Sequence, residues 1–165
     1  MTIRTASTAD GKALAEIYNH YIVNSTATFE EVVLSAEDMK QRVLAVAELG
    51  LPWLVAEQQG QVVGYAYANR WKERSAYRFS VESTVYLLPD IGSRGWGTRL
   101  YTALFEELRT LDVHAVIGSI TLPNPASVAL HEKMGMSKVA EFPEVGFKQN
   151  QWLTVGYWQI IFARA

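Results

Sequence analysis

Residues 85–98 read VYLLPDIGSRGWGT, and this stretch decides the fold. An apolar segment ends at Pro89, glycines follow at positions 92, 95 and 97, and a run with leucines at 100, 104, 108 and 111 comes next. This order predicts a strand, a glycine-rich turn and an amphipathic helix. Glycines let backbone N–H groups converge on one point, and the helix start adds its own unpaired N–H groups. The turn is therefore a candidate anion cradle, with Arg94 as a neighbouring cation.

Two known nucleotide-binding motifs do not fit this turn. A dinucleotide-binding loop needs three glycines at GxGxxG spacing and an acidic residue after the next strand, whereas Asp112 precedes that strand here. A Walker A loop needs Gly-Lys-Ser/Thr, which the chain lacks. A glycine-bearing turn can also be purely structural, and the glycines alone leave that alternative open.

Strand and helix patterns alternate around the turn, without a linker or an internal repeat. Ser7 and Ser35 are each followed three residues later by an acid, a capping-box pattern that predicts the start of a helix. Gly50 and Gly135 are placed to end helices. Helices are also expected over 98–111 and from Asn124 to 134. The expected strands cover residues 3–5, 53–57, 62–69, 82–88, 114–120, 138–142 and 152–162, with a loop over 70–79. We predict a single α/β (α+β) domain over residues 1–165, whose central mixed, mostly antiparallel sheet is flanked by helices.

The composition excludes several classes of function. The chain has 165 residues, 49% hydrophobic and 19% charged, with a net charge of −2, so no basic field favours nucleic acid or an anionic membrane. It has no cysteine, which excludes disulfides, thiolate metal sites and an acyl-cysteine intermediate. We see neither a leader pattern nor an apolar run of the roughly 20 residues that cross a membrane. We therefore expect a soluble, cytoplasmic protein that binds neither nucleic acid nor a membrane.

The glycine turn resembles the pyrophosphate loop of the GCN5-related N-acetyltransferase (GNAT) superfamily. In that superfamily, Gln/Arg-x-x-Gly-x-Gly/Ala joins a pantetheine-binding strand to a helix. Gly95 and Gly97 match the last two positions, whereas Gly92 stands where Gln or Arg is usual. Arg94 can compensate for that difference.

An ordered set of further motifs resembles one branch, the phosphinothricin and methionine sulfone/sulfoximine N-acetyltransferases. The set comprises WK-x-R-x-AY at 71–77, ESTVY at 82–86, LY at 100–101, LPN at 122–124 with Ser127, HE at 131–132, GFK at 146–148 and VGYWQ at 155–159. The resemblance covers nearly the whole chain. It implies a homodimeric, metal-independent enzyme that transfers acetyl directly from acetyl-CoA to the α-amine of an amino-acid-like substrate.

N-acetylation needs a base, because an α-amino group is mostly protonated at neutral pH. Glu82 alone can be read as a surface carboxylate or as the partner of Arg78, but the resemblance assigns it as the general base. The leaving thiolate needs a proton donor, for which His131 and Tyr86 are the candidates. Either can instead be structural. A backbone N–H near Val85 to Leu87 is the candidate oxyanion donor.

The resemblance also assigns binding residues. Those for acetyl-CoA are Val85, Tyr86, Leu87, Ser93, Arg94, Gly95, Trp96, Gly97, Thr98, Asn124, Ser127 and Lys133. Capping of a helix by Asn124 and a dipole role for Lys133 are simpler alternatives. Those for the substrate are Phe29, Glu30, Lys72, Arg74, Ser75, Ala76, Tyr77 and Glu82. The basic loop among them would hold a carboxylate, or it is simply solvated.

Two other functions stay open at this point. One is an acetyltransferase for another amine, such as a protein N-terminus or a polyamine, although the arginine-rich loop disfavours a polyamine. The other is a non-catalytic acyl-CoA-binding module, against which Glu82 argues. Phosphinothricin, methionine sulfone and methionine sulfoximine are equally compatible with the motifs.

Overall fold

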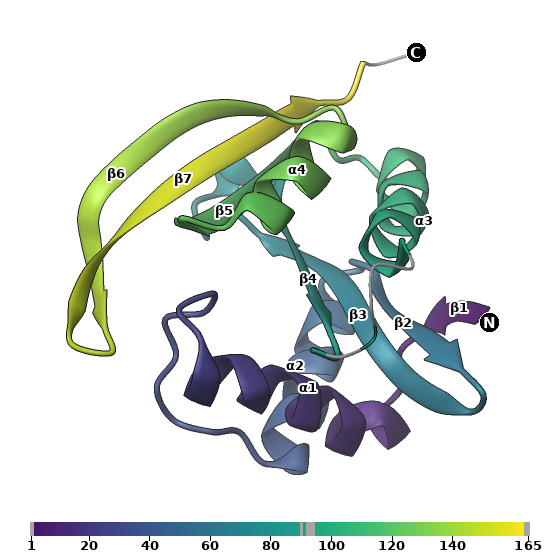
Figure 1. Ribbon diagram of the computed structural model, residues 1–165. Coiled ribbons are helices and arrows are strands. Elements are labelled where there is room, and N and C mark those ends of the chain that lie inside the picture. Colours follow the sequence, from purple (N-terminus) through teal and green to yellow (C-terminus); the bar gives the residue numbers. More distant parts are fainter. Residues whose placement is uncertain (1, 90, 92–94, 164–165) are drawn as a thin grey trace.

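A central sheet organises the chain in the computed structural model, which describes residues 2–89, 91 and 95–163 (Figure 1). Its strands are β1 (Thr2–Thr5), β2 (Trp53–Gln58), β3 (Gln61–Arg70), β4 (Ser80–Leu87), β5 (Ala115–Leu122), β6 (Ser137–Lys148) and β7 (Gln151–Ile161). Their order is β1-β2-β3-β4-β5-β7-β6. Only the β4–β5 pair is parallel among the described strands. The predicted mixed, mostly antiparallel sheet is confirmed.

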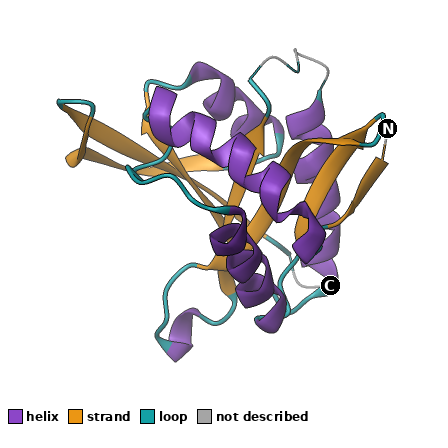
Figure 2. Cartoon of the chain, turned by 90° about the horizontal axis from the view of Figure 1, so that it is seen from below, coloured by secondary structure: helices purple, strands orange, loops and turns teal. Residues whose placement is uncertain are grey.

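Helices cover both faces of the sheet. The first pair, α1 (Gly11–Asn24) and α2 (Ala36–Glu48), lies across one face, as the view from below shows (Figure 2). The second pair, α3 (Trp96–Thr110) and α4 (Pro125–Lys133), covers the other (Figure 1). Short 3-10 turns, η1 (Thr8–Asp10) and η2 (Ser75–Tyr77), precede α1 and β4. No helix in the described part of the chain is long and apolar enough to cross a membrane.

The predicted helix starts are confirmed by their caps. The Ser35 hydroxyl accepts a hydrogen bond from the Asp38 N–H at 3.1 Å, and the Ser7 N–H donates to the Asp10 carboxylate at 2.8 Å. The Asn124 side chain accepts from the Ser127 N–H at 3.1 Å and so caps α4. These side chains satisfy N–H groups that a helix start leaves unpaired.

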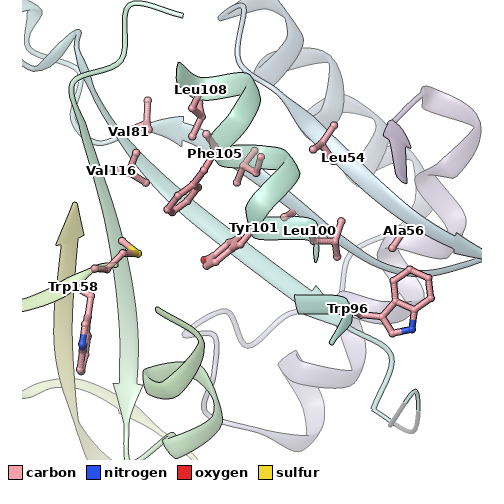
Figure 3. Close-up of a cluster of buried hydrophobic side chains, with 14 of the residues drawn as sticks. Leu54, Ala56, Val81, Trp96, Leu100, Tyr101, Phe105, Leu108, Val116 and Trp158 are labelled. Carbon is pink, nitrogen blue, oxygen red and sulfur yellow. The ribbon is translucent and has the colours of Figure 1, made fainter. Parts of the chain in front are cut away.

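Each pair of helices has its own hydrophobic core. Leu100, Leu104 and Leu108 of α3 are fully buried, as their spacing predicts. Figure 3 shows Leu100 and Leu108 in this core. On the other face, Leu14 of α1 and Met39 of α2 belong to a second cluster. Burial of such leucines contributes about 1.5–3 kcal/mol each.

Most element boundaries differ from the prediction by one or two residues, and one strand differs by more. The third helix begins at Trp96 and ends at Thr110, so Leu111 lies just past its end and is 39% exposed. Strand β6 runs over Ser137–Lys148, well beyond the predicted 138–142. Pro143 lies within β6, but β6 is an edge strand, and its register shifts between Phe142 and Gly146. Proline is tolerated at such edges and irregularities because no ladder hydrogen bond is needed.

The feature that creates the site is a split in the sheet. The parallel pairing of β4 with β5 joins only Ser80–Glu82 to Ala115–Ile117. Both strands then continue, to Leu87 and to Leu122, without further pairing between them. Beyond Glu82 the backbone groups of β4 that face β5 are therefore available to another partner.

Candidate active site

A cavity of about 800 Å³ lies at this split and is lined by β4 from Glu82 to Leu87. Successive side chains of a strand point to opposite faces. Glu82 and Tyr86 therefore face α1, whereas Ser83 and Leu87 face α3 and α4, in agreement with their contacts. The cavity thus connects the two faces of the sheet through the gap between β4 and β5.

The half of the cavity toward α3 and α4 carries the predicted cradle. Gly95 adopts φ +73° directly before α3, a conformation that favours glycine. A Cβ on Gly97 would lie 3.1 Å from a methyl carbon of Leu130, so this glycine lets α3 approach α4 closely. Gly97, Asn124 and Ser127 all line the cavity. The glycine turn therefore places the N-terminus of α3 at this half.

A buried hydrogen-bonded chain joins β4, α3 and α4 in the same half. The His131 Nδ1 lies 2.7 Å from the Ser127 carbonyl, which can only accept, so Nδ1 carries the proton. Nε2 then accepts from the Tyr101 hydroxyl at 3.2 Å, and the Ser83 hydroxyl donates to Tyr101 at 3.5 Å. The hydrogen bonds therefore assign the tautomer and the direction of the chain.

Burial determines the protonation states of His131 and Tyr101 in this series of hydrogen bonds. Burial lowers the pKa of His131 below its usual 6.5, opposed by the Ser127 carbonyl. Burial likewise raises the pKa of Tyr101 well above its usual value. Both groups are neutral at pH 7. The Nδ1–H group and the Nε2 lone pair of the His131 ring each have a hydrogen-bond partner.

The half of the cavity toward α1 contains the predicted base. The Glu82 carboxylate accepts a hydrogen bond of 2.6 Å from the Ser119 hydroxyl on β5. Arg78, the alternative partner, instead lies 4.3 Å over the Phe79 ring and donates to the Ser75 carbonyl. Glu82 is the last residue of β4 that pairs with β5, so its carboxylate sits where the split opens.

Tyrosines surround this half. The Tyr86 ring lies 5.1 Å from Tyr18 and 4.9 Å from Tyr21, and the Tyr21 hydroxyl donates to the Leu87 carbonyl at 2.7 Å. Burial raises the pKa of Tyr67 to about 12 and that of Tyr86 well above its usual value. These phenols are therefore neutral hydrogen-bonding groups at pH 7, and Glu82 is the one carboxylate among the described lining residues.

The predicted site residues fall into three groups. Those that line the cavity are Phe29, Glu82, Val85, Tyr86, Leu87, Gly97, Asn124, Ser127 and His131. Those described but outside its lining are Glu30, Lys72, Arg74, Ser75, Ala76, Tyr77, Gly95, Trp96, Thr98 and Lys133. Ser93, Arg94 and the variant position Gly92 lie outside the described residues.

Several residues outside the lining have other contacts. Trp96 is 1% exposed in the core under α3 (Figure 3). Glu30 forms an ion pair with Arg42 at 2.8 Å. The loop from Lys72 to Tyr77 lies near the cavity rim, because the neighbouring Trp71 ring contacts that of Tyr157, a lining residue, at 5.9 Å.

Sequence reasoning missed many lining residues, namely Tyr18, Tyr21, Thr28, Tyr67, Ser83, Thr84, Tyr101, Ser119 and Tyr157. Tyr18 and Tyr21 follow helical spacing, which is equally typical of the apolar face of a helix. The one usable signal is alternation along β4, which places Ser83 on the opposite face from Glu82, toward α3 and α4.

Residues 3–154 match an acetyltransferase (GNAT) domain family. The chain is 39% identical to the phosphinothricin N-acetyltransferase of Streptomyces viridochromogenes, over 95% of this chain and 85% of the relative. It is 34% identical to the L-methionine sulfoximine/L-methionine sulfone acetyltransferase of Salmonella typhimurium, over 97% and 94%. The solved structure of an acetyltransferase from Salmonella typhimurium with its cofactor acetyl-CoA superposes with a TM-score of 0.97 and 33% identity, covering 100% of this chain and 95% of that one. The chain therefore belongs to the GNAT family, and it is an acetyl-CoA-dependent N-acetyltransferase.

Proposed function

We propose that this protein acetylates the α-amine of a small amino-acid-like substrate in the cytoplasm. The observation that carries the proposal is the cavity through the split sheet, with a glycine turn and helix start on one side and Glu82 on the other. The names of the phosphinothricin and methionine sulfoximine/sulfone relatives support this substrate class.

Acetyl-CoA would bind in the half toward α3 and α4. The unpaired edge of β4 from Val85 to Leu87 offers backbone hydrogen bonds to an extended pantetheine arm. The start of α3, with Gly95, Gly97 and Thr98, offers N–H groups and a positive dipole end to the pyrophosphate.

Other side chains complete the proposed cofactor half. Ser93 and Arg94 precede the helix start in sequence, and Asn124, the N-cap of α4, lines the cavity together with Ser127. Trp96 would contribute only through its backbone, since its side chain is buried in the core. Lys133, exposed at the end of α4, would act at longer range.

Glu82 is the proposed general base. Its carboxylate takes a proton from the substrate ammonium, while the Ser119 hydroxyl holds the carboxylate in place. The amine nitrogen then bonds to the acetyl carbon, and backbone N–H groups near Val85 to Leu87 stabilise the oxyanion. The nitrogen loses its second proton as the carbon–sulfur bond breaks, which balances the proton that the leaving thiolate takes up. The products are the amide and free CoA.

The leaving thiolate needs a proton, and two donors are proposed. Tyr86 retains its proton at neutral pH, because burial raises its pKa well above the usual value, and its phenol bonds to the Thr28 side chain. His131 would first have to exchange a hydrogen bond, since its N–H is donated to the Ser127 carbonyl. We therefore propose Tyr86 as the first of the two donors.

The substrate carboxylate is proposed to bind at the rim, where Lys72 and Arg74 precede η2 (Ser75–Tyr77). The Lys72 ammonium lies over the Trp71 and Tyr77 rings at 5.6 and 5.8 Å, which keeps a cation on this side of the rim. Phe29 lines the cavity from the α1 side, with Glu30 behind it.

A homodimer is also proposed, from an exposed apolar face on the β6–β7 hairpin. Its large exposed side chains are Val139, Phe142, Val145, Phe147, Trp152 and Ile161. The rings of Phe147 and Trp152 lie 5.0 Å apart, and exposed apolar groups that gather in this way can mark an interaction site. Light scattering during gel filtration tests it: Trp152→Glu, at a 63% exposed position, should shift a dimer toward monomer.

Thiol release from acetyl-CoA tests the activity. The acceptors are phosphinothricin, methionine sulfone, methionine sulfoximine, ordinary amino acids, spermidine and an alanine-started peptide. We expect turnover with an amino-acid-like acceptor. Preference for spermidine or the peptide would overturn the substrate class. Acetyl-CoA binding without thiol release for any amine would indicate a binding module.

Substitution of the base tests the mechanism separately. Glu82→Gln should lower kcat by roughly 10²–10⁴-fold, the usual contribution of general base catalysis, with the acetyl-CoA Kd unchanged. Full turnover by this variant between pH 6 and 9 would refute the role of Glu82.

A further inference from the structure

Lys148, near the end of β6, is a buried lysine that the proposed mechanism does not use. Its side chain is 3% exposed. The ammonium donates hydrogen bonds to the carbonyls of Ser25 at 2.8 Å and Thr28 at 2.7 Å, with the Tyr21 carbonyl at 3.5 Å. These carbonyls belong to the last turn of α1 and the loop beyond it. An ammonium has three donors, so one lysine can hold all three carbonyls together.

The loop that Lys148 holds is a wall of the acceptor half. Ala27, Thr28 and Phe29 line the cavity. The Thr28 hydroxyl lies 2.7 Å from the Tyr18 hydroxyl and accepts from the Glu30 N–H at 3.2 Å. Because Tyr18 also lines the cavity, the position of Thr28 fixes part of the aromatic surface as well.

A second contact from the same strand supports the same loop. A Cβ added to Gly146 would lie 2.1 Å from the Phe29 ring, so this ring rests directly on the β6 backbone. The adjacent Val145 lines the cavity. Beyond Lys148, the Gln149 side-chain amide donates to the Val23 carbonyl at 3.4 Å. The end of β6 is thus joined to the end of α1 at several points, and Figure 1 shows the tip of the β6–β7 hairpin beside this loop.

We propose that Lys148 is a positioning residue for the acceptor: its ammonium holds the loop Ser25–Phe29 at the distance from β4 that the acceptor requires. The inference rests on the proposed function. Lys148 touches carbonyls rather than either substrate, and the acetyl-CoA half lies on the other face of the sheet. Loss of the ammonium leaves buried carbonyls without their donor, and the loop moves to find water.

Steady-state kinetics of Lys148→Met test the proposal. We expect KM for the acceptor to rise about tenfold or more, which corresponds to roughly 1.4 kcal/mol. KM for acetyl-CoA and kcat should stay within about twofold to threefold of the wild-type values. Hydrogen exchange of residues 25–29 should become faster. Lys148→Arg, which keeps N–H donors, should recover part of the acceptor KM.

Two further variants complete the test. Lys138→Met removes an exposed lysine from the same strand and should match the wild type. Gly146→Ala displaces the Phe29 ring without touching the lysine, so it should raise the acceptor KM by an independent route. If Lys148→Met does not fold, Lys148→Arg decides the question: it should raise the acceptor KM and leave that for acetyl-CoA unchanged, and an unchanged acceptor KM would overturn the positioning role.

The outcomes separate the two proposals. An unchanged acceptor KM in Lys148→Met, or an equal rise in both KM values, overturns the positioning role. A wild-type protein that acetylates no amino-acid-like acceptor overturns the proposed function instead.

Discussion

Removal of one hydroxyl group, by Tyr101→Phe, should destabilise the protein far more than its size suggests. Tyr101 is 1% exposed and stands between Ser83 on β4 and His131 on α4. Its hydroxyl donates to the His131 Nε2 at 3.2 Å and accepts from the Ser83 hydroxyl at 3.5 Å. Phenylalanine keeps the ring and its packing against Phe105, at 5.5 Å between centroids, and removes only the hydrogen bonds.

The size of the effect follows from the groups left behind. His131 is 3% exposed, so its Nε2 would be buried without a donor. Such an unsatisfied group costs about 1–3 kcal/mol. The Ser83 contact is at the limit of a hydrogen bond, and this hydroxyl can rotate toward the cavity, so it adds little. The expected loss is therefore about 1–3 kcal/mol, with a fall in Tm of roughly 2–4 °C for each kcal/mol in a domain of this size.

Urea denaturation at pH 7.5, followed by circular dichroism, measures this change. Tyr77→Phe removes a phenol hydroxyl from the partly exposed turn η2 and should stay within about 0.5 kcal/mol of the wild type. If the free energy of unfolding of Tyr101→Phe also falls by less than about 0.5 kcal/mol, the buried hydrogen bonds through Tyr101 do not hold β4 to α4. That result would refute the reasoning.

Three further predictions concern the same half of the molecule. Gly118→Ala should cost about 1–3 kcal/mol in the same denaturation assay, because a Cβ there would lie 2.4 Å from the His131 ring; a neutral result would show that the ring can move aside. Gly95→Ala should cost about 1 kcal/mol through its φ of +73°, since its Cβ would meet no atom of the described residues within 4 Å. Gly95→Asn should cost less, and equal losses would contradict a backbone origin. Acidification should destabilise the protein, because burial lowers the pKa of His131 below 6.5 in the folded state. Below about pH 6.5 the unfolded chain therefore binds a proton that the folded chain does not. Stability is lost as the pH falls toward the lower folded pKa. His131→Gln should remove this part of the pH dependence between pH 7.5 and 5.5, and an unaltered slope would contradict the assignment.

The sequence predicted the elements that carry their own local signals. Capping boxes at Ser7 and Ser35 and the glycine turn before α3 are short-range patterns, and each stands where it was expected. Strand β6 was underestimated because its residues are mostly exposed, so no alternation of burial marks it. Its extent depends on pairing with β7, which a local pattern does not contain.

The site was predictable along β4 and much less so elsewhere. Glu82 to Leu87 lie together on one strand, and the resemblance to a family named them in order. Tyr18, Tyr67 and Ser119 come from three other elements, and they meet only because β4 and β5 separate. An aromatic side chain that lines a cavity follows the same periodicity as one in the core, so the pattern does not distinguish them.

Strand β4 has two edges that behave differently toward solvent. Toward β3 its ladder is continuous from Val81 to Leu87, whereas toward β5 it stops at Glu82. In the free protein, neighbouring amide hydrogens of this single strand should therefore exchange at alternating rates, slow toward β3 and fast toward the cavity. An extended molecule that occupied the gap would slow the fast set and leave the slow set unchanged. The exchange rates of individual β4 amides therefore report whether the gap between β4 and β5 is occupied.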